Sequence, residues 1–133
     1  MLETGKTASI ARVVCEQDLA SAYADSSDER YPDVLSTPAM LGLMERACAE
    51  IMRCELTEGQ LSVGVTTNLN HLAPTRLGVE VVATAIFRSR EGSLFWFDVA
   101  ATDPGGAVGN GSHARAIVSR SGIELRAEKR LIA

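Results

Sequence analysis

Glu45 is the one carboxylate that stands in the middle of the most apolar run of the chain, residues 37–52. Apolar residues occupy nearly every face of this run, which is typical of a helix enclosed by protein. At about 100° per residue, Arg46, Glu50 and Arg53 share one narrow polar stripe, whereas Glu45 projects about 100° away from its centre. A carboxylate turned away from the solvent stripe must be paired, shifted in pKa or used in catalysis. Glu45 is therefore a candidate base or nucleophile, with a structural ion pair as the alternative.

Thr37 and His71 are two further groups that could take part in chemistry. Thr37 precedes Pro38 and is a natural helix N-cap, where N–H groups and the helix dipole favour developing negative charge. His71 ends an alternating segment and can carry protons near neutral pH, although a half-exposed strand histidine is the simpler interpretation. A hydroxyl nucleophile needs a nearby base. Glu45 lies two turns along the helix, roughly 12 Å away at 1.5 Å per residue, so a site between two subunits or a bend in the helix would be needed to join it to Thr37.

The composition is that of an ordinary globular chain. Its 133 residues are 46% hydrophobic and 23% charged, which predicts a single domain over residues 1–133 that needs neither disulfides nor a structural metal. The net charge of −4 and the scattered basic residues argue against a nucleic-acid partner.

The cysteines and the N-terminus indicate the compartment. Cys15, Cys48 and Cys54 follow no disulfide or zinc spacing, which predicts a reducing environment and no metal site. The sequence shows no signal-peptide pattern and no stretch long enough to cross a membrane, so we expect a cytoplasmic protein without a membrane partner.

The elements that must position these groups are one helix and a series of strands. Residues 7–15 predict a strand, residues 16–36 a loop with short helical turns, and residues 37–56 the helix. Alternating segments then predict four strands, with a strand extension or frayed tail at the end: residues 61–73, 79–89, 93–102 and 107–120, and the tail 121–133. Short turns imply antiparallel neighbours, so we predict an α+β fold with a curved five-stranded antiparallel sheet. The helix is apolar on more faces than one flat sheet covers. The sheet must wrap around it or a second subunit must cover it, and both descriptions fit the hotdog fold, whose members are usually dimers built by edge-to-edge pairing of two sheets.

Several motifs carry a family resemblance between about residues 31 and 118. They are residues 31–37 (YPDVLST), 40–48 (MLGLMERAC), 62–65 (SVGV), 70–74 (NHLAP) and 109–116 (GNGSHARA). With their spacing they resemble the fluoroacetyl-CoA thioesterase-like family. The resemblance implies the hotdog fold with its sheet around one long central helix, a homodimer, and hydrolysis of acyl-CoA thioesters with no cofactor beyond the CoA of the substrate.

The resemblance also implies roles for individual residues. The family's catalytic threonine, glutamate and histidine match Thr37, Glu45 and His71. Glu45 would attack the thioester directly, or act as a base on water or on Thr37. His71 would carry protons, and these alternatives stay open.

The substrate-binding residues of the family match Gly64, Arg115 and, loosely, Tyr31. Gly64 would offer its backbone N–H to the substrate. By strand alternation Arg115 shares a face with His113. If that face is covered, Arg115 would contact Glu45 or the CoA phosphates; otherwise it would face solvent. The family has phenylalanine at the positions of Tyr31, its aromatic lid residue, and of Leu35. These two differences bear on which acyl group the site accepts. They do not change the expected fold or reaction class.

Two other functions are compatible with these residues. A dehydratase of hydroxyacyl thioesters also uses a histidine and a carboxylate, but the sequence lacks that family's usual histidine-first helix region. A non-catalytic acyl-CoA binding module would keep the pocket without needing Thr37, Glu45 and His71 together.

Overall fold

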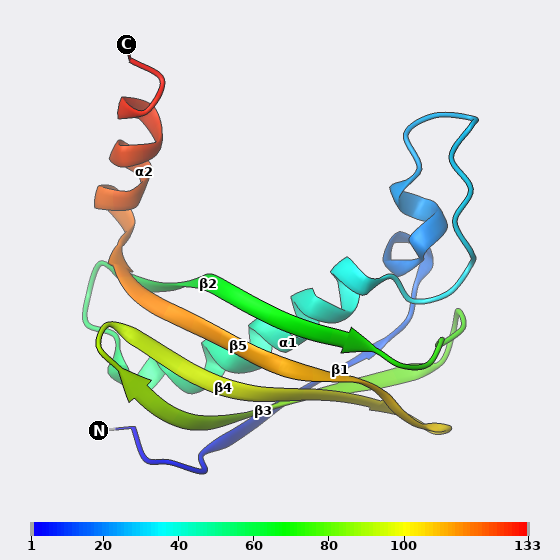
Figure 1. Cartoon of the computed structure of the whole chain (residues 1–133), viewed down its shortest axis with the longest axis horizontal. Coiled ribbons are helices and arrows are strands. Elements are labelled where there is room, and N and C mark those ends of the chain that lie inside the picture. Colours follow the sequence, from blue (N-terminus) through cyan, green and yellow to red (C-terminus); the bar gives the residue numbers. More distant parts are fainter. Residues whose placement is uncertain (1, 133) are drawn as a thin grey trace.

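A curved sheet with one long helix on its inner side makes up the body of the protein (Figure 1). The computed structural model describes residues 2–132. The strands and helices are β1 (Thr7–Val13), α1 (Thr37–Met52), β2 (Gln60–His71), β3 (Glu80–Glu91), β4 (Leu94–Asp103), β5 (Gly106–Ser119) and α2 (Arg120–Lys129). Short 3₁₀ turns, η1 to η3, span Glu16–Asp18, Ala20–Tyr23 and Arg53–Glu55. The predicted order of a strand, a long helix and four further strands is confirmed.

The strands form one antiparallel sheet in the order β1-β3-β4-β5-β2. The turns before β4 and β5 contain Gly92 and Gly106 at φ values of 63° and 119°, a backbone region that favours glycine. β2 pairs with β5 from Gln60↔Ser119 to His71↔Gly109, with an irregularity between Gly64 and Thr66. β2 is therefore an edge strand, and its outer side is open in the single chain.

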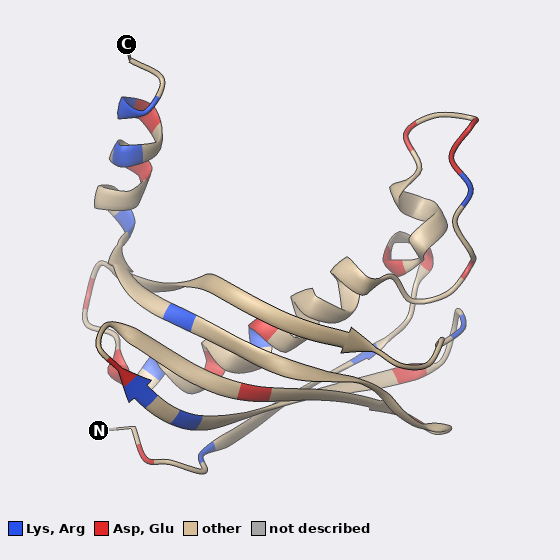
Figure 2. Cartoon of the chain, in the orientation of Figure 1, with Lys and Arg blue, Asp and Glu red and all other residues tan. Residues whose placement is uncertain are grey.

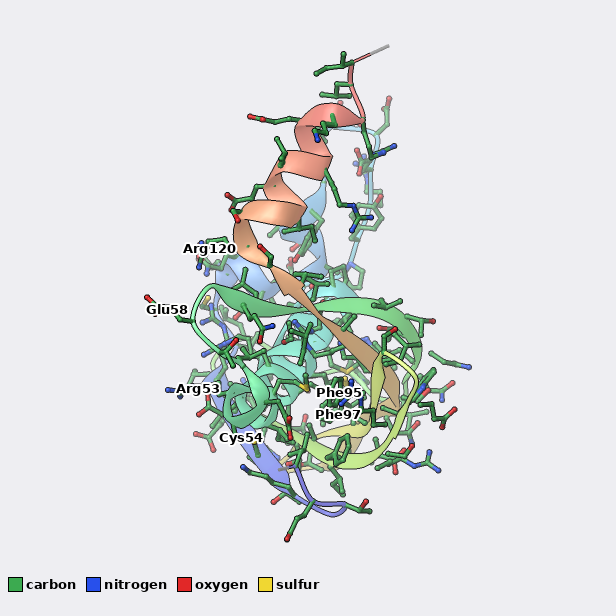
Figure 3. All side chains as sticks on the ribbon, turned by 90° about the vertical axis from the view of Figure 1, so that its left-hand side faces the viewer. Arg53, Cys54, Glu58, Phe95, Phe97 and Arg120 are labelled. Carbon is green, nitrogen blue, oxygen red and sulfur yellow. The ribbon has the colours of Figure 1, made fainter. Side chains whose placement is uncertain are left out.

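The core lies between the concave face of the sheet and α1. On β3 and β4 every second residue is buried, and the set comprises Val81, Ala83, Ala85, Phe87, Phe95, Phe97, Val99 and Ala101. Figure 3 shows Phe95 and Phe97 inside the curve of the sheet. The helix buries seven side chains, namely Met40, Leu43, Met44, Ala47, Cys48, Ile51 and Met52. The sheet alone thus covers most faces of α1, as the apolar pattern of this run predicted.

The start of α1 differs by one residue from the prediction. Ser36, and not Thr37, is the N-cap, because the Ser36 Oγ accepts a hydrogen bond of 3.1 Å from the Ala39 N–H. Two adjacent residues of capping type leave this choice open in the sequence. The hydroxyl of Thr37, which is the first helical residue, is consequently available for another partner.

The prediction of a strand extension or frayed tail for residues 121–133 was wrong, because most of this segment forms α2. The Ser119 Oγ accepts a hydrogen bond from the Gly122 N–H, and the run from Glu124 to Lys129 consists of good helix formers. None of the α2 side chains is fully buried, so the apolar stripe by which helices are usually found is missing. Among the described residues, no helix is long and apolar enough to span a membrane.

Burial of Met44 predicts a large loss of stability on truncation. Met44 is 0% exposed beneath the sheet, and Met44→Ala should lower the free energy of unfolding by about 2–5 kcal/mol because it leaves a cavity in the core. Chemical denaturation followed by circular dichroism measures this loss. Leu131→Ala is the matched control, since Leu131 is 86% exposed and its truncation should change stability by less than about 0.5 kcal/mol. Equal losses for the two variants would contradict the proposed packing.

Candidate active site

Thr37 and His71 meet at the end of α1 that faces the end of β2. The Thr37 Oγ1 lies 2.8 Å from the His71 Nδ1, although the two residues are 34 positions apart. A close approach of α1 to the sheet makes this meeting possible. A Cβ on Gly109, which pairs with His71, would lie 2.6 Å from the Met40 Sδ and 2.8 Å from the Asn70 carbonyl oxygen. Glycine at this position leaves room for the Met40 side chain, in the first turn of α1, and for the backbone of β2.

The geometry of this pair suits activation of a hydroxyl group. When His71 is neutral with its proton on Nε2, the Thr37 hydroxyl donates to Nδ1, and the imidazole can accept that proton as the oxygen attacks. The Nε2 atom is buried and has no hydrogen-bond partner within residues 2–132. Leaving a buried polar group unpaired costs about 1–3 kcal/mol, so a substrate or a second chain is expected to complete it. Val34, Leu72, Ala73 and Pro74 line the shallow hollow around the pair.

Glu45 belongs to a second group of side chains, which is organised by Arg115. The Arg115 Nη1 donates to the Glu45 Oε2 at 3.1 Å. The Arg115 side chain is only 7% exposed, whereas that of Glu45 is 39% exposed. Arg115 also donates from Nε to the Ser62 Oγ and from Nη2 to the Ser62 carbonyl, both at 2.9 Å. The expected contact between Arg115 and Glu45 is therefore present, and the solvent-facing alternative for Arg115 was wrong.

His113 completes this group, and the hydrogen bonds determine its tautomer. The Arg115 Nη1 lies 3.0 Å from the His113 Nε2, and because an arginine only donates, Nε2 must be the acceptor. The proton of the neutral ring is then on Nδ1, which lies 2.7 Å from the Thr67 Oγ1. Burial, together with the nearby charge of Arg115, lowers the pKa of His113, which favours this neutral form.

At Gly64, the Glu45 carboxylate and the His113 ring lie close against the backbone of β2. A Cβ at Gly64 would lie 2.9 Å from the Glu45 Oε2 and 3.0 Å from the His113 Cε1. A side chain there would displace the carboxylate or the imidazole. The missing side chain at Gly64 therefore makes room for the Glu45 carboxylate and the His113 ring against the backbone of β2.

The structure brings together some of the expected site residues and leaves others apart. Thr37 contacts His71, and Glu45 contacts Arg115 beside Gly64, but no hydrogen bond among the described residues links these two groups. Tyr31 is exposed, and its hydroxyl lies 2.9 Å from the Glu29 carboxylate rather than next to either group. The role of His113 was missed by sequence reasoning, although strand alternation had placed it on the face of Arg115.

Two other chemistries find little support in this region. Within residues 2–132, no group of three or more His, Cys, Asp or Glu side chains is arranged to hold a metal ion. Cys48, on α1, lies near Glu45 of the same helix and near Arg115 of β5. Burial raises the pKa of the Cys48 thiol to about 12. A thiol with that pKa is not a thiolate nucleophile near neutral pH.

Comparisons with known proteins agree with this fold. The family model described as fluoroacetyl-CoA-specific thioesterase matches residues 14–121. A fluoroacetyl-CoA thioesterase from Streptantibioticus cattleyicolor is 39% identical over 97 residues, which cover 72% of this chain and 70% of that protein.

Solved structures extend the similarity over nearly the whole chain. The fluoroacetyl-CoA thioesterase FlK has a TM-score of 0.91 at 30% identity, with 97% of each chain covered. A variant of FlK has been solved in complex with acetyl-CoA. A hot-dog-like protein from Thermanaerovibrio acidaminovorans has a TM-score of 0.84 at 29% identity, covering 98% of this chain and 93% of its own. The resemblance predicted from the motifs is thus confirmed, and the chain belongs to the fluoroacetyl-CoA-specific thioesterase family of hotdog-fold enzymes.

Proposed function

We propose that this chain hydrolyses a small acyl-CoA thioester to the free acid and CoA. The observation that carries this proposal is the hydrogen bond of 2.8 Å between the Thr37 Oγ1 and the His71 Nδ1. It holds a hydroxyl against a base at the N-terminus of α1, where the helix dipole favours negative charge on the attacked group. Hydrolysis by such groups needs water and no cofactor besides the CoA of the substrate. A cytoplasmic location and the lack of nucleic-acid and membrane partners stay predictions.

The remaining residues divide the catalytic work in this proposal. The backbone N–H of Gly64 polarises the thioester carbonyl, as an oxyanion-hole donor does. Glu45, held by Arg115, attacks the carbonyl or activates a water molecule, and His71 carries the proton to the departing thiolate. Tyr31 has a substrate-side role in this proposal only through the family resemblance, because in the single chain its hydroxyl contacts Glu29 and neither group of the site. The order of these steps depends on whether Thr37 or Glu45 forms the first bond to the acyl carbon.

The separation of Thr37 from Glu45 supports a site completed by a second copy. Eight residues along α1 correspond to roughly 12 Å, which is too far for one acyl carbon to contact both side chains. We therefore propose a homodimer in which β2 pairs antiparallel with β2 of a second copy. The stretch Gly64–Asn68 at the centre of β2 is exposed, and Val65 is 54% exposed. A long, exposed edge strand is a template for pairing, and pairing with its own copy generates a two-fold axis.

An acyl-CoA panel tests the proposed activity directly. Purified protein should release free thiol from one or more of acetyl-, fluoroacetyl-, propionyl-, butyryl- and an aromatic acyl-CoA, followed with a thiol reagent. The acyl group with the highest kcat/KM then reports the size of the pocket. Acyl-CoA that raises the Tm but survives incubation would instead indicate a binding module. Formation of an enoyl product from a 3-hydroxyacyl-CoA would indicate a dehydratase.

Removal of the Thr37 hydroxyl should reduce turnover strongly. Thr37→Val keeps the shape of the side chain but leaves the His71 Nδ1 without its partner, and we expect kcat to fall on the order of 10²–10⁴-fold. Ser36→Ala is the matched control, because it removes the neighbouring hydroxyl that caps α1. It should lower stability by about 1 kcal/mol while leaving kcat near the wild-type value. Similar kcat values for Thr37→Val and wild type would remove Thr37 from the mechanism.

The Glu45 group gives an independent test. Glu45→Gln preserves size and the contact to Arg115 but removes the carboxylate, so turnover should collapse while acyl-CoA still binds. Gly64→Ala should also reduce kcat, since the added Cβ would lie 2.9 Å from the Glu45 Oε2. Ile86→Ala, at a position of β3 that is 41% exposed, serves as the strand control, and its kcat should stay within about twofold since surface substitutions rarely disturb the fold. Full activity in Glu45→Gln would rule out Glu45 as base or nucleophile.

A further inference from the structure

Beyond Arg120, which lies about 40° from Glu124, the charges of α2 and of its C-cap Arg130 are divided between two opposite sides of the helix. At about 100° per residue, Arg126, Lys129 and Arg130 lie within roughly 100° of one another, while Glu124 and Glu128 point to the other side. We call the first three residues the basic face. All three are exposed, and none of them takes part in an ion pair within residues 2–132. α2 therefore presents three uncompensated positive charges on a helix that buries no side chain.

The loop before α1 carries the opposite charge. Residues 25–33, the acidic segment, contain Asp25, Asp28, Glu29 and Asp33 against a single arginine, Arg30. Arg30 donates to the carbonyl oxygens of Ser27 and Glu29 rather than to any of these carboxylates. Figure 2 shows the acidic residues along this loop and the basic residues along α2. The segment thus keeps a net negative charge that its own arginine does not pair.

These two surfaces lie at opposite ends of β2. α2 follows Ser119, which pairs with Gln60 at the first residue of β2. The acidic segment precedes Thr37, which contacts His71 at the last residue of β2. Both α2 and the loop extend beyond the β2 edge on the same side of the sheet (Figure 1), and Arg120 marks the base of α2 in Figure 3. In one chain, the length of β2 keeps them apart.

We propose that the basic face of α2 docks against the acidic segment of a second copy of this chain. The inference rests on the proposed dimer paired through β2. Antiparallel pairing of β2 with itself brings the Gln60 end of one copy to the His71 end of the other. The two-fold axis then places α2 of each copy beside the acidic segment of its neighbour, twice in the dimer. Opposite charges at both junctions select this antiparallel arrangement over a slipped one.

This docking has a consequence for the site. The acidic segment includes Tyr31 and leads through Leu35 and Ser36 into Thr37. Its carboxylates would repel the phosphates of CoA if they stayed uncompensated, because like charges interact unfavourably over about 10 Å at 0.1 M salt. The basic face of the neighbouring α2 neutralises them and holds the loop over the Thr37–His71 end of the site.

Mixing two charge-reversed chains tests the docking. One chain carries Arg126→Glu and Arg130→Glu, and the other carries Asp25→Lys and Asp28→Lys. Each homodimer then has like charges at both junctions, and its dissociation constant should rise on the order of tenfold at low salt, since exposed ion pairs are individually weak. In the mixed dimer one junction is native and the other has its charges exchanged, so both are attractive. Native mass spectrometry of an equimolar mixture should show heterodimer well above the statistical half.

Each outcome separates the docking from the dimer on which it rests. Chains carrying Lys6→Glu or Glu3→Lys, near the opposite edge of the sheet, are the controls and should mix at random. The excess of heterodimer should fall as salt is raised. Random mixing of the reversed chains with unchanged dissociation constants would overturn the docking and leave the β2-paired dimer standing. A wild-type chain that sediments as a monomer would overturn both.

Discussion

The positive charge of Arg115 is the constraint on which the arrangement of the site depends. Its guanidinium is buried where β5, β2 and α1 meet, and it is compensated by Ser62, Glu45 and His113. A charge removed from water is tolerated only when its donors are paired. The demand for acceptors explains why a carboxylate projects from an apolar helix at this height and why the His113 Nε2 faces the guanidinium, and the glycine at the facing position of β2 leaves room for both.

Two fixed points on α1 then determine where chemistry can occur. Arg115 contacts the middle of the helix through Glu45, and His71 contacts its first turn through Thr37. Thr37 and Glu45 lie about 12 Å apart along α1 at 1.5 Å per residue. The Thr37–His71 pair and the Glu45 group are thus two separate groups, each held by a hydrogen bond between α1 and the sheet.

The sequence predicted the elements better than the contacts between them. Period-two alternation located all four later strands, and the apolar run located α1, because both signals are local. The choice between Ser36 and Thr37 as N-cap depends on side-chain geometry that two adjacent capping residues do not distinguish. α2 was missed because it has no buried stripe, although its helix formers and the Ser119 cap were visible.

For the site residues too, local sequence patterns predicted which side chains share a face but not which of them are buried or in contact. Alternation correctly put His113 and Arg115 on one face, but whether that face is buried depends on the position of β5 between β4 and β2. The contact between Thr37 and His71 depends on how far β2 extends before it ends, which is a property of its pairing with β5. Residue types suggested the participants, and only the register of the sheet determines which of them meet.

The open edge of β2 runs past both groups of side chains. Gly64, which gives Glu45 and His113 access to the backbone, lies at the start of the exposed stretch of that edge. The His71 Nε2, at the other end of the same strand, is buried without a partner within the described chain. The unpaired edge of β2 thus runs between the Glu45 group and the Thr37–His71 pair. In the β2-paired dimer proposed above, a second copy of the strand would cover this edge from end to end, because two-fold pairing treats the two ends of β2 equally.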